Sequence, residues 1–156
     1  MGRGFTIIEL VACLAILAVL STLALPLAEL AVKRQKEAEL RRALWELRDA
    51  IDAYKRAGDE GRIARDASRS GYPPDLMTLV QGRPDAKAPQ SGHVVYFIRR
   101  IPRDPFFEDS SVPAHLTWGL RSYASPPDAP RPGADVFDVY SLSAAVGVNG
   151  IPYGKW

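Results

Sequence analysis

GFTIIELVACLAILAVLSTLALPLAELA, residues 4–31, is the longest apolar segment of the chain, and the predicted architecture depends on it. From Ile7 to Leu27 it is almost unbroken apolar sequence, with Glu9 as its single carboxylate. About 20 helical residues cross a hydrocarbon layer of about 30 Å, so this stretch predicts a membrane-spanning helix. A lone acid in lipid costs on the order of a few kcal/mol, and such residues usually mark function. We therefore expect Glu9 to meet a positively charged partner.

The segment Gly4-Phe5-Thr6-Ile7-Ile8-Glu9-Leu10 resembles the class III signal of type IV pilins and type II secretion pseudopilins. In that family a short basic leader ends in Gly, the next residue is usually Phe, and a Glu follows inside an apolar helix. The resemblance implies that residues 1–4 are a leader, which a prepilin peptidase removes between Gly4 and Phe5 before methylating the new amine. Pro26 stands where the family often has a helix proline, and it predicts a kink because it has no N–H to donate.

Cleavage after Gly4 places a positive amine on Phe5, one helical turn from Glu9. Within one chain this pair is poorly placed, because the free N–H groups and the dipole of the helix start already surround the amine. Between neighbouring chains of a filament, Glu9 of one chain can meet the amine of the next and neutralise a costly buried charge. The alternative is an ordinary signal peptide cut among the small residues of 23–31. The position of Glu9 inside the apolar region counts against that alternative.

The remainder of the chain is long enough for one small domain with a modest core. The formal net charge is +2, from 20 basic and 18 acidic residues, and this balance indicates no nucleic-acid partner. Cys13 is the only cysteine and lies in the apolar segment, which excludes an intrachain disulfide. An exported domain of this kind must be stabilised by packing, by a metal or by its neighbours.

Basic residues follow the apolar segment more densely than they precede it, since only Arg3 and the initial amine come before. The positive-inside bias alone would place the C-terminal side in the cytoplasm. The leader motif implies the opposite orientation, and we follow the leader motif. The basic residues concerned are Lys33, Arg34, Lys36, Arg41 and Arg42.

One long helix is predicted, because no glycine and only one proline interrupt residues 5–57. It would be a rod of about 80 Å, with a transmembrane and assembly half at 5–32 and an amphipathic half at 33–58. Spacings of four and three predict an apolar stripe that docks on a globular head. The stripe comprises Leu40, Leu44, Leu47, Ile51 and Tyr54. Opposite charges four residues apart predict ion pairs on the solvated side, namely Glu37–Arg41, Arg42–Glu46, Arg48–Asp52 and Asp52–Arg56.

Residues 59–156 are predicted to form the head. A short helix is expected to start within residues 72–76, with Pro73 or Pro74 near its first turn, and to reach about Val80. Strands are predicted at 93–101, 116–123 and 134–142, with the last two forming an antiparallel hairpin on the helix stripe. The tail, residues 147–156, is expected to cover the sheet edge with Tyr153 and Trp156 as anchors. The predicted fold is therefore α+β and pilin-like, with a long N-terminal membrane-spanning helix packed on a small antiparallel sheet.

Three pieces of the head resemble, in their order, the major-type (G-like) pseudopilins of type II secretion: GYPPDL at 71–76, IPRDP at 101–105 and FDVYSL at 137–142. The resemblance implies a structural filament subunit that assembles with other pseudopilin subunits at an inner-membrane platform. It implies a bacterial inner-membrane protein with a single pass through membrane lipid and a periplasmic head.

In that family the loop after the last strand is acidic and holds calcium. Residues 143–150 contain no carboxylate here, and Ala145 stands where an aspartate is expected. Calcium needs several oxygen ligands, carboxylates above all, so we predict no metal and no cofactor.

No catalytic site is predicted. His93 and His115 are too far apart in sequence for a helical metal pair, and no phosphate loop or nucleophilic serine motif occurs. Capping and solvation explain the acids near turns and strand edges, which are Asp104, Glu108, Asp109, Asp135 and Asp138. Two alternatives to a pseudopilin stay open: a minor pilin of a type IV or competence pilus, and a membrane-anchored periplasmic binding or enzymatic domain.

Overall fold

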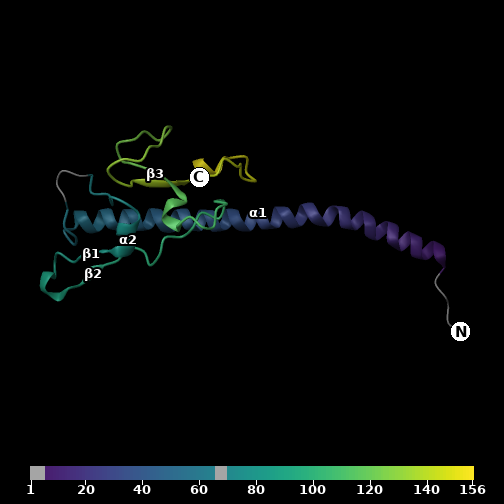
Figure 1. Ribbon diagram of the computed structural model, residues 1–156, viewed down its shortest axis with the longest axis horizontal. Helices are drawn as coiled ribbons and strands as arrows, with labels where there is room; N and C mark the ends of the chain where they lie inside the picture. Colours follow the sequence, from purple (N-terminus) through teal and green to yellow (C-terminus); the bar gives the residue numbers. More distant parts are fainter. Residues whose placement is uncertain (1–5, 66–69) are drawn as a thin grey trace. The chain divides into compact units, whose positions relative to one another are not determined.

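The computed structural model describes residues 6–65 and 70–156, without the side chains of Leu20 and of residues 22–25 (Figure 1). Contacts divide the chain into two compact units, Met1–Lys36 and Glu37–Trp156. The fold is α+β, with a long N-terminal helix and two small antiparallel sheets, and this is consistent with a pilin-like fold. The helices are α1 (Ile7–Asp59) and α2 (Met77–Gln81). The strands are β1 (Arg83–Pro84), β2 (Val94–Val95), β3 (Trp118–Arg121) and β4 (Asp138–Ser141). Three 3-10 turns are also present: η1 (Pro89–Ser91), η2 (Ala114–Leu116) and η3 (Tyr153–Lys155).

The prediction of one long helix is confirmed, since α1 extends from Ile7 to Asp59 with Pro26 inside it. The kink at Pro26 stays a prediction. Within the part of the chain that the structure describes, no helix combines the length and the apolar character needed to cross a membrane. The predicted span, residues 5–32, also includes Phe5 and five side chains that lie outside the described part.

The core of the second unit lies against α1. All five residues of the predicted stripe are buried there: Leu40, Leu47 and Ile51 are fully covered, and Tyr54 exposes only 7 % of its surface. Full burial of a side chain such as Leu or Ile stabilises the fold by about 1.5–3 kcal/mol. The side chains that complete this core come from α2, both strands of the hairpin and the tail, and they include Leu79, Trp118, Val136, Val139 and Tyr153.

The predicted antiparallel hairpin is confirmed, but its strands are shorter than expected. β3 pairs with β4 in the register Trp118↔Ser141 to Arg121↔Asp138. β3 starts late because η2 occupies Ala114–Leu116. In a regular strand Val136 and Val139, three residues apart, would face opposite sides, yet both are buried. Val136 precedes the strand and donates its N–H to the carbonyl of Pro73 at 2.8 Å, so strand alternation does not apply to it.

The predicted strand at 93–101 is wrong beyond its first residues. Only Val94–Val95 forms β2, which pairs antiparallel with β1. The N–H groups of Phe97 and Ile98 donate instead to the carbonyl of Leu79, at 3.1 and 3.3 Å. The chain therefore leaves the strand to cover the end of α2.

α2 begins at Met77, later than the proline positions predict. Asp75 acts as the local acceptor, because its Oδ1 receives the N–H of Thr78 at 2.8 Å and the hydroxyl of Thr78 at 3.0 Å. Pro73 is buried and holds Val136 through its carbonyl, so it belongs to the core and not to the helix.

Candidate assembly and processing site

Thr6 and Glu9 form a reciprocal hydrogen-bonded pair at the start of α1. Glu9 Oε2 accepts the N–H of Thr6 at 3.0 Å and the hydroxyl of Thr6 at 2.9 Å. The N–H of Glu9 donates to Thr6 Oγ1 at 3.4 Å. This is a capping box, in which a residue before the helix and a Glu three positions later satisfy donors that the helix leaves free.

The capping box gives Glu9 a role within a single chain that the sequence analysis missed. The signal was present, since Thr-x-x-Glu before an apolar run is the sequence signature of this cap. Both bonds from Thr6 end on Oε2, and within the described residues Oε1 receives no hydrogen bond. Gly4 and Phe5 lie outside the described residues, so cleavage between them and the pairing of Glu9 with the Phe5 amine stay predictions.

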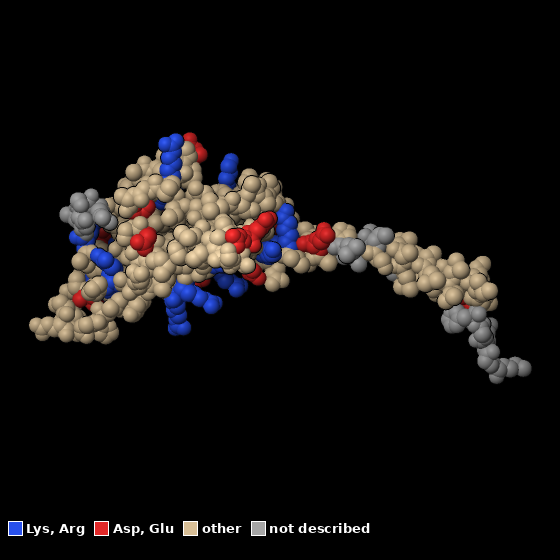
Figure 2. Space-filling model, viewed as in Figure 1, with Lys and Arg blue, Asp and Glu red and all other residues tan. Residues whose placement is uncertain are grey.

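The apolar side chains that follow Glu9 are uncovered. Every side chain described between Thr6 and Glu29 is exposed, and Ile7 and Ile8 expose 82 % and 77 % of their surfaces. Figure 2 shows this segment of α1 as an almost uncharged surface, whereas basic and acidic side chains are interspersed on the visible face of the head. A helix that is apolar all round needs a non-aqueous neighbour, either lipid or other apolar helices.

Glu37 is the second functional candidate, and its position corrects a prediction. Charge spacing places it on the solvated side beside Arg41, but it is buried, with 5 % of its surface exposed. Its Oε1 accepts the N–H of Val148 at 2.7 Å and the hydroxyl of Tyr153 at 2.9 Å. Arg41 lies elsewhere, with its guanidinium 4.4 Å from the ring centroid of Trp156. The missed signal is the spacing, because Glu37 precedes Leu40 by three residues and so continues the buried stripe.

Glu37 changes the chemistry of Tyr153. Burial of the phenol, together with its hydrogen bond to the Glu37 carboxylate and the charge of that carboxylate, raises the pKa of Tyr153 to about 12. The phenol therefore remains a proton donor to Glu37 across the ordinary pH range. The pair joins α1 to the tail that follows the hairpin.

The loop 143–150, where the resemblance would place calcium, is closed by protein groups. Besides the bond from Val148 to Glu37, the carbonyl of Ala145 accepts the N–H of Tyr153 at 3.1 Å, and Asn149 Oδ1 accepts the N–H of Ile151 at 3.0 Å. Among the described residues, no cluster of three or more His, Cys, Asp or Glu side chains is arranged to hold a metal ion. The absence of a cofactor stays a prediction.

Four of the five acids considered as a carboxylate site have hydrogen-bond partners, namely Asp104, Asp109, Asp135 and Asp138. Asp104 is fully buried, and its carboxylate accepts the hydroxyl of Ser141 at 2.6 Å and the N–H of Phe106 at 2.8 Å. Asp135 accepts the hydroxyl of Ser70 and, at 2.8 Å, the N–H of Tyr123. These bonds fix turns and strand ends.

Arg48 corrects a second predicted ion pair. Its Nε donates to Asp138 Oδ1 at 2.8 Å, and it does not pair with Asp52. Its other nitrogens donate to the main-chain oxygens of Trp156 at 3.1 Å and Val139 at 3.3 Å. The planar guanidinium thus binds α1 to both β4 and the tail, which a Lys ammonium could not match in geometry.

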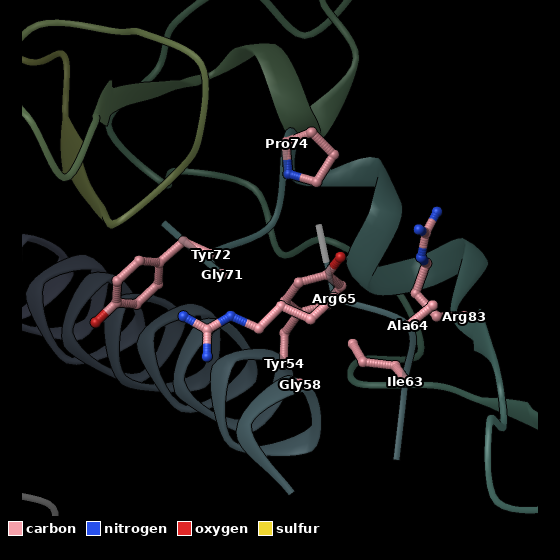
Figure 3. A pocket seen from close by; sticks show the side chains of 9 residues that line it. All are labelled: Tyr54, Gly58, Ile63, Ala64, Arg65, Gly71, Tyr72, Pro74 and Arg83. Atoms are coloured by element: carbon pink, nitrogen blue, oxygen red, sulfur yellow. The ribbon is translucent and has the colours of Figure 1, made fainter. Parts of the chain in front are cut away.

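A cavity of about 300 Å³ lies at the far end of α1 (Figure 3). Arg65 extends across it toward Tyr72, while its Nη1 pairs with Asp59 at 2.9 Å. The described residues that line the cavity are Tyr54, Gly58, Ile63, Ala64, Arg65, Gly71, Tyr72, Pro74 and Arg83.

Comparison with protein-family models matches residues 2–25 to the prokaryotic N-terminal methylation motif. This motif is typical of type IV pilin-like proteins. It spans Gly4, Phe5 and Glu9, so the methylation-type leader motif is confirmed. No curated protein and no solved structure matches the chain.

Proposed function

We propose that this chain is a structural filament subunit, a major-type pseudopilin of a type II protein secretion system. Residues 5–32 anchor it in the inner membrane, and the head lies in the periplasm. The observation that carries the proposal is the methylation motif at residues 2–25, which leads into a helix segment whose described side chains are all exposed. Assembly would bury those side chains among the same segments of neighbouring subunits.

Glu9 would select the correct neighbour during assembly. In the free subunit its Oε2 holds the capping box, which is worth about 0.5–2 kcal/mol. A neighbouring Phe5 amine that enters an apolar bundle without a counter-charge would cost about 3–5 kcal/mol. Because Oε1 accepts nothing within the described chain, it can bind that amine while Oε2 keeps the cap. The cap and the intersubunit charge pair are therefore compatible.

The choice of secretion system rests on the head. The order of the 71–76, 101–105 and 137–142 segments resembles the major-type pseudopilins. Asp104 and Asp135 hold a strand end and a loop by hydrogen bonds, and this is compatible with a structural role. The partners would be other pseudopilin subunits, the prepilin peptidase, the inner-membrane assembly platform and membrane lipid. Neither enzymatic activity nor nucleic-acid binding forms part of the proposal.

Mass analysis of the N-terminus tests the proposal directly. Protein extracted from the membrane should begin at a methylated Phe5. A chain that begins between about residues 23 and 32 would be the product of an ordinary signal peptidase and would overturn the proposal. A variant with Gly4→Val should keep its leader, because a branched side chain would then stand at the cleavage position.

The composition of sheared filaments separates the remaining alternatives. Mass spectrometry should find this chain as the main subunit, whereas a minor pilin would be a small fraction. The cavity beside Tyr54 is the observation that favours an anchored binding domain. That alternative predicts a chain that is absent from filaments and a ligand whose binding is lost when Arg83 or Tyr72 is replaced by Ala.

A further inference from the structure

The tail of the head and one flank of α1 enclose a hollow of about 280 Å³, which we call the basic hollow. Trp45 and Trp156 form part of its wall, and 71 % of the Trp45 surface is exposed. The guanidinium of Arg41 lies 4.4 Å from the ring centroid of Trp156. Three cationic side chains line the basic hollow, and no carboxylate occurs among the described residues that line it. The cations are Arg41, Arg48 and Lys155.

Two of these three cations have no acidic partner within the described part of the chain. Arg48 is paired with Asp138. Arg41 and Lys155 are exposed, and neither takes part in the ion pairs that the described residues form. Trp and Arg are enriched among the residues that carry binding energy in protein interfaces. Indole rings beside unpaired cations therefore favour a ligand that combines carboxylates with an apolar or aromatic side chain.

A segment of this composition lies in the same chain, at residues 106–111, FFEDSS, which we call the acidic loop. Glu108 and Asp109 are exposed there, and among the described residues neither carboxylate forms an ion pair. Asp109 accepts the N–H and the hydroxyl of Ser111, at 2.9 and 2.6 Å. Phe107 is half-buried beside them. The acidic loop thus offers two carboxylates and an aromatic ring.

The sequence contains one other pair of adjacent acids, Asp59 and Glu60. The carboxylate of Asp59 is bound by Lys55 at 2.5 Å and by Arg65 at 2.9 Å. Its charge is therefore compensated within the chain. Of the two pairs, the one in the acidic loop is the better match for the unpaired cations of the basic hollow.

The acidic loop and the basic hollow lie on opposite flanks of α1. Arg103 holds the loop, because its guanidinium donates to the carbonyl oxygens of Asp109 and Val112. Arg103 lies beside positions 39, 42, 43 and 46 of α1, whereas the basic hollow lies beside positions 41, 44, 45 and 48. On a helix with 3.6 residues per turn these two sets face directions about 160° apart. Within one chain the loop and the hollow are therefore kept apart, but a second copy can bring them together.

We propose that the basic hollow of one copy of this chain receives the acidic loop of a second copy, with Glu108 and Asp109 binding Lys155 and Arg41. The inference rests on the proposed function, because anchoring in one membrane holds neighbouring heads side by side in the same orientation. The contact joins two different surfaces. Such heterologous contacts continue from copy to copy and form an open helical assembly when the rotation does not close a ring. Each head would use its loop on one neighbour and its hollow on another.

Charge reversal in the full-length, membrane-inserted chain tests the contact. Lys155→Glu alone and Glu108→Lys alone should each lower the yield of sheared filament about tenfold, because each places like charges together at every contact. The double variant E108K/K155E restores opposite charges and should recover the yield at least about fivefold over either single change. A double variant that recovers nothing would overturn the proposal.

Glu60→Lys and Lys87→Glu are the matched controls, since they make the same two changes at exposed positions outside both surfaces. They should leave the yield unchanged, and an equal loss in the controls would mean that net charge, not this contact, governs assembly. A loss from Lys155→Glu without a loss from Glu108→Lys would mean that the basic hollow holds another anion, such as an acidic segment of a different protein or a lipid headgroup. Either result would overturn the proposal. Thermal melting of each variant checks that the head is folded.

Cysteine cross-linking then identifies the two surfaces, in a chain whose only cysteine has been removed by Cys13→Ala. One copy carries Glu108→Cys and a differently tagged copy carries Lys155→Cys, so a mixed disulfide must join two chains. This disulfide should form in membranes and in sheared filaments, since it needs Cα atoms about 4.4–6.8 Å apart. Joining of position 108 to itself or of position 155 to itself, in place of the mixed product, would indicate a two-fold contact and would contradict the proposal.

The outcomes separate this inference from the proposed function. If the parent chain assembles, but the charge reversals leave the yield unchanged and the mixed disulfide is absent, the contact is wrong and the filament function stands. If the parent chain is processed at Phe5 but forms no filament, the proposed function is contradicted. The presence or absence of the mixed disulfide in membranes would still decide the contact in that case.

Discussion

Glu9 has two roles to separate, and two conservative substitutions separate them. Glu9→Gln can keep the capping box, because Gln also serves at this position, but it loses the charge. Thr6→Val keeps the charge and loses the hydroxyl of the cap, at a cost of about 0.5–2 kcal/mol to the helix start. We expect Glu9→Gln to lose filaments nearly as completely as Glu9→Ala, and Thr6→Val to retain most of them. The measurement is sheared filament yield relative to processed subunit in the membrane.

The processed fraction is the control for these variants. Cleavage at Gly4 should persist in Glu9→Gln, since the peptidase acts before neighbouring subunits meet. Wild-type filament yield from Glu9→Gln would mean that the carboxylate is retained for the cap and not for an intersubunit charge pair. A collapse of assembly in Thr6→Val, with normal processing, would point to the same conclusion.

Because of Tyr153, the free energy of unfolding of the head should decrease with pH in the alkaline range. Its pKa is raised from the ordinary value of 10.0 to about 12, first by burial and then by its hydrogen bond to Glu37. A raised pKa means that the folded state holds the proton more tightly than the unfolded state does. The stabilisation is therefore complete below about pH 10 and is lost as the pH rises from about 10 to about 12.

Tyr153→Phe is the matched control for that transition. It should be less stable than wild type near neutral pH by about 1–3 kcal/mol, since Glu37 loses a buried donor. The difference in stability between wild type and Tyr153→Phe, measured by melting, should then decrease as the pH rises from about 10 to about 12. A difference that is constant over this range would contradict the pairing of Tyr153 with Glu37.

In the hairpin, Tyr140 lies over Gly119. The two residues are direct partners in the β3–β4 register, and a Cβ at Gly119 would lie 2.3 Å from the Tyr140 ring. Gly119→Ala should destabilise the head by about 1–3 kcal/mol, because the ring must move from its packed position. The double variant with Tyr140→Ala should be less destabilised than the sum of the two single changes, because the clash is absent.

Gly58 provides the matched control for this prediction, measured by the same denaturant titrations. It lies in the last turns of α1, and a methyl group added there would have its nearest neighbour 4.0 Å away, on Ile63. Gly58→Ala should be neutral or should stabilise the head by about 0.5–1 kcal/mol, because alanine favours the helix. Equal losses from Gly58→Ala and Gly119→Ala would show that the ring contact is not the cause.

The loop 143–150 should hold its shape without calcium. Glu37 from α1 already supplies a carboxylate to its backbone at Val148, and the loop itself has no acid. Melting of the full chain in detergent should be the same with calcium and with a chelator. A rise of several degrees with calcium would contradict this prediction and would identify a site formed by main-chain oxygens or by ligands outside the loop.

The spacing of apolar residues predicts α1 and its buried stripe, because helical periodicity depends only on residues that are close together in sequence. Strand limits depend on distant partners: Phe97 donates to Leu79 and Val136 donates to Pro73, and no local pattern encodes either bond. The charge of Glu37 favours the solvated side, but its stripe position decides where it lies. The capping box at Thr6 was readable from the sequence, whereas the bond from Arg48 to Asp138 joins segments far apart in the chain.

At the scale of the whole molecule, two signals conflict over which side of the membrane holds the head. Lys33, Arg34 and Lys36 follow the apolar segment, and the positive-inside bias would keep them in the cytoplasm. The methylation motif lies at residues 2–25. In the proposed function a peptidase acts on the leader from the cytoplasm, and the head would then lie on the other side. Processing is a specific recognition event, whereas the charge bias is statistical.

We therefore expect the head to face the periplasm, and a reporter that is active only outside the cytoplasm tests this when fused after Trp156. The fusion preserves the main-chain oxygen of Trp156 that accepts from Arg48, so the tail can keep its place. A second fusion at the exposed residues 127–129 controls for damage to the tail. Neutralising Lys33, Arg34 and Lys36 should leave both reporters active. If the reporters are inactive at both positions and a cytoplasmic reporter is active there, the charge bias sets the orientation. That result would also contradict the pseudopilin proposal.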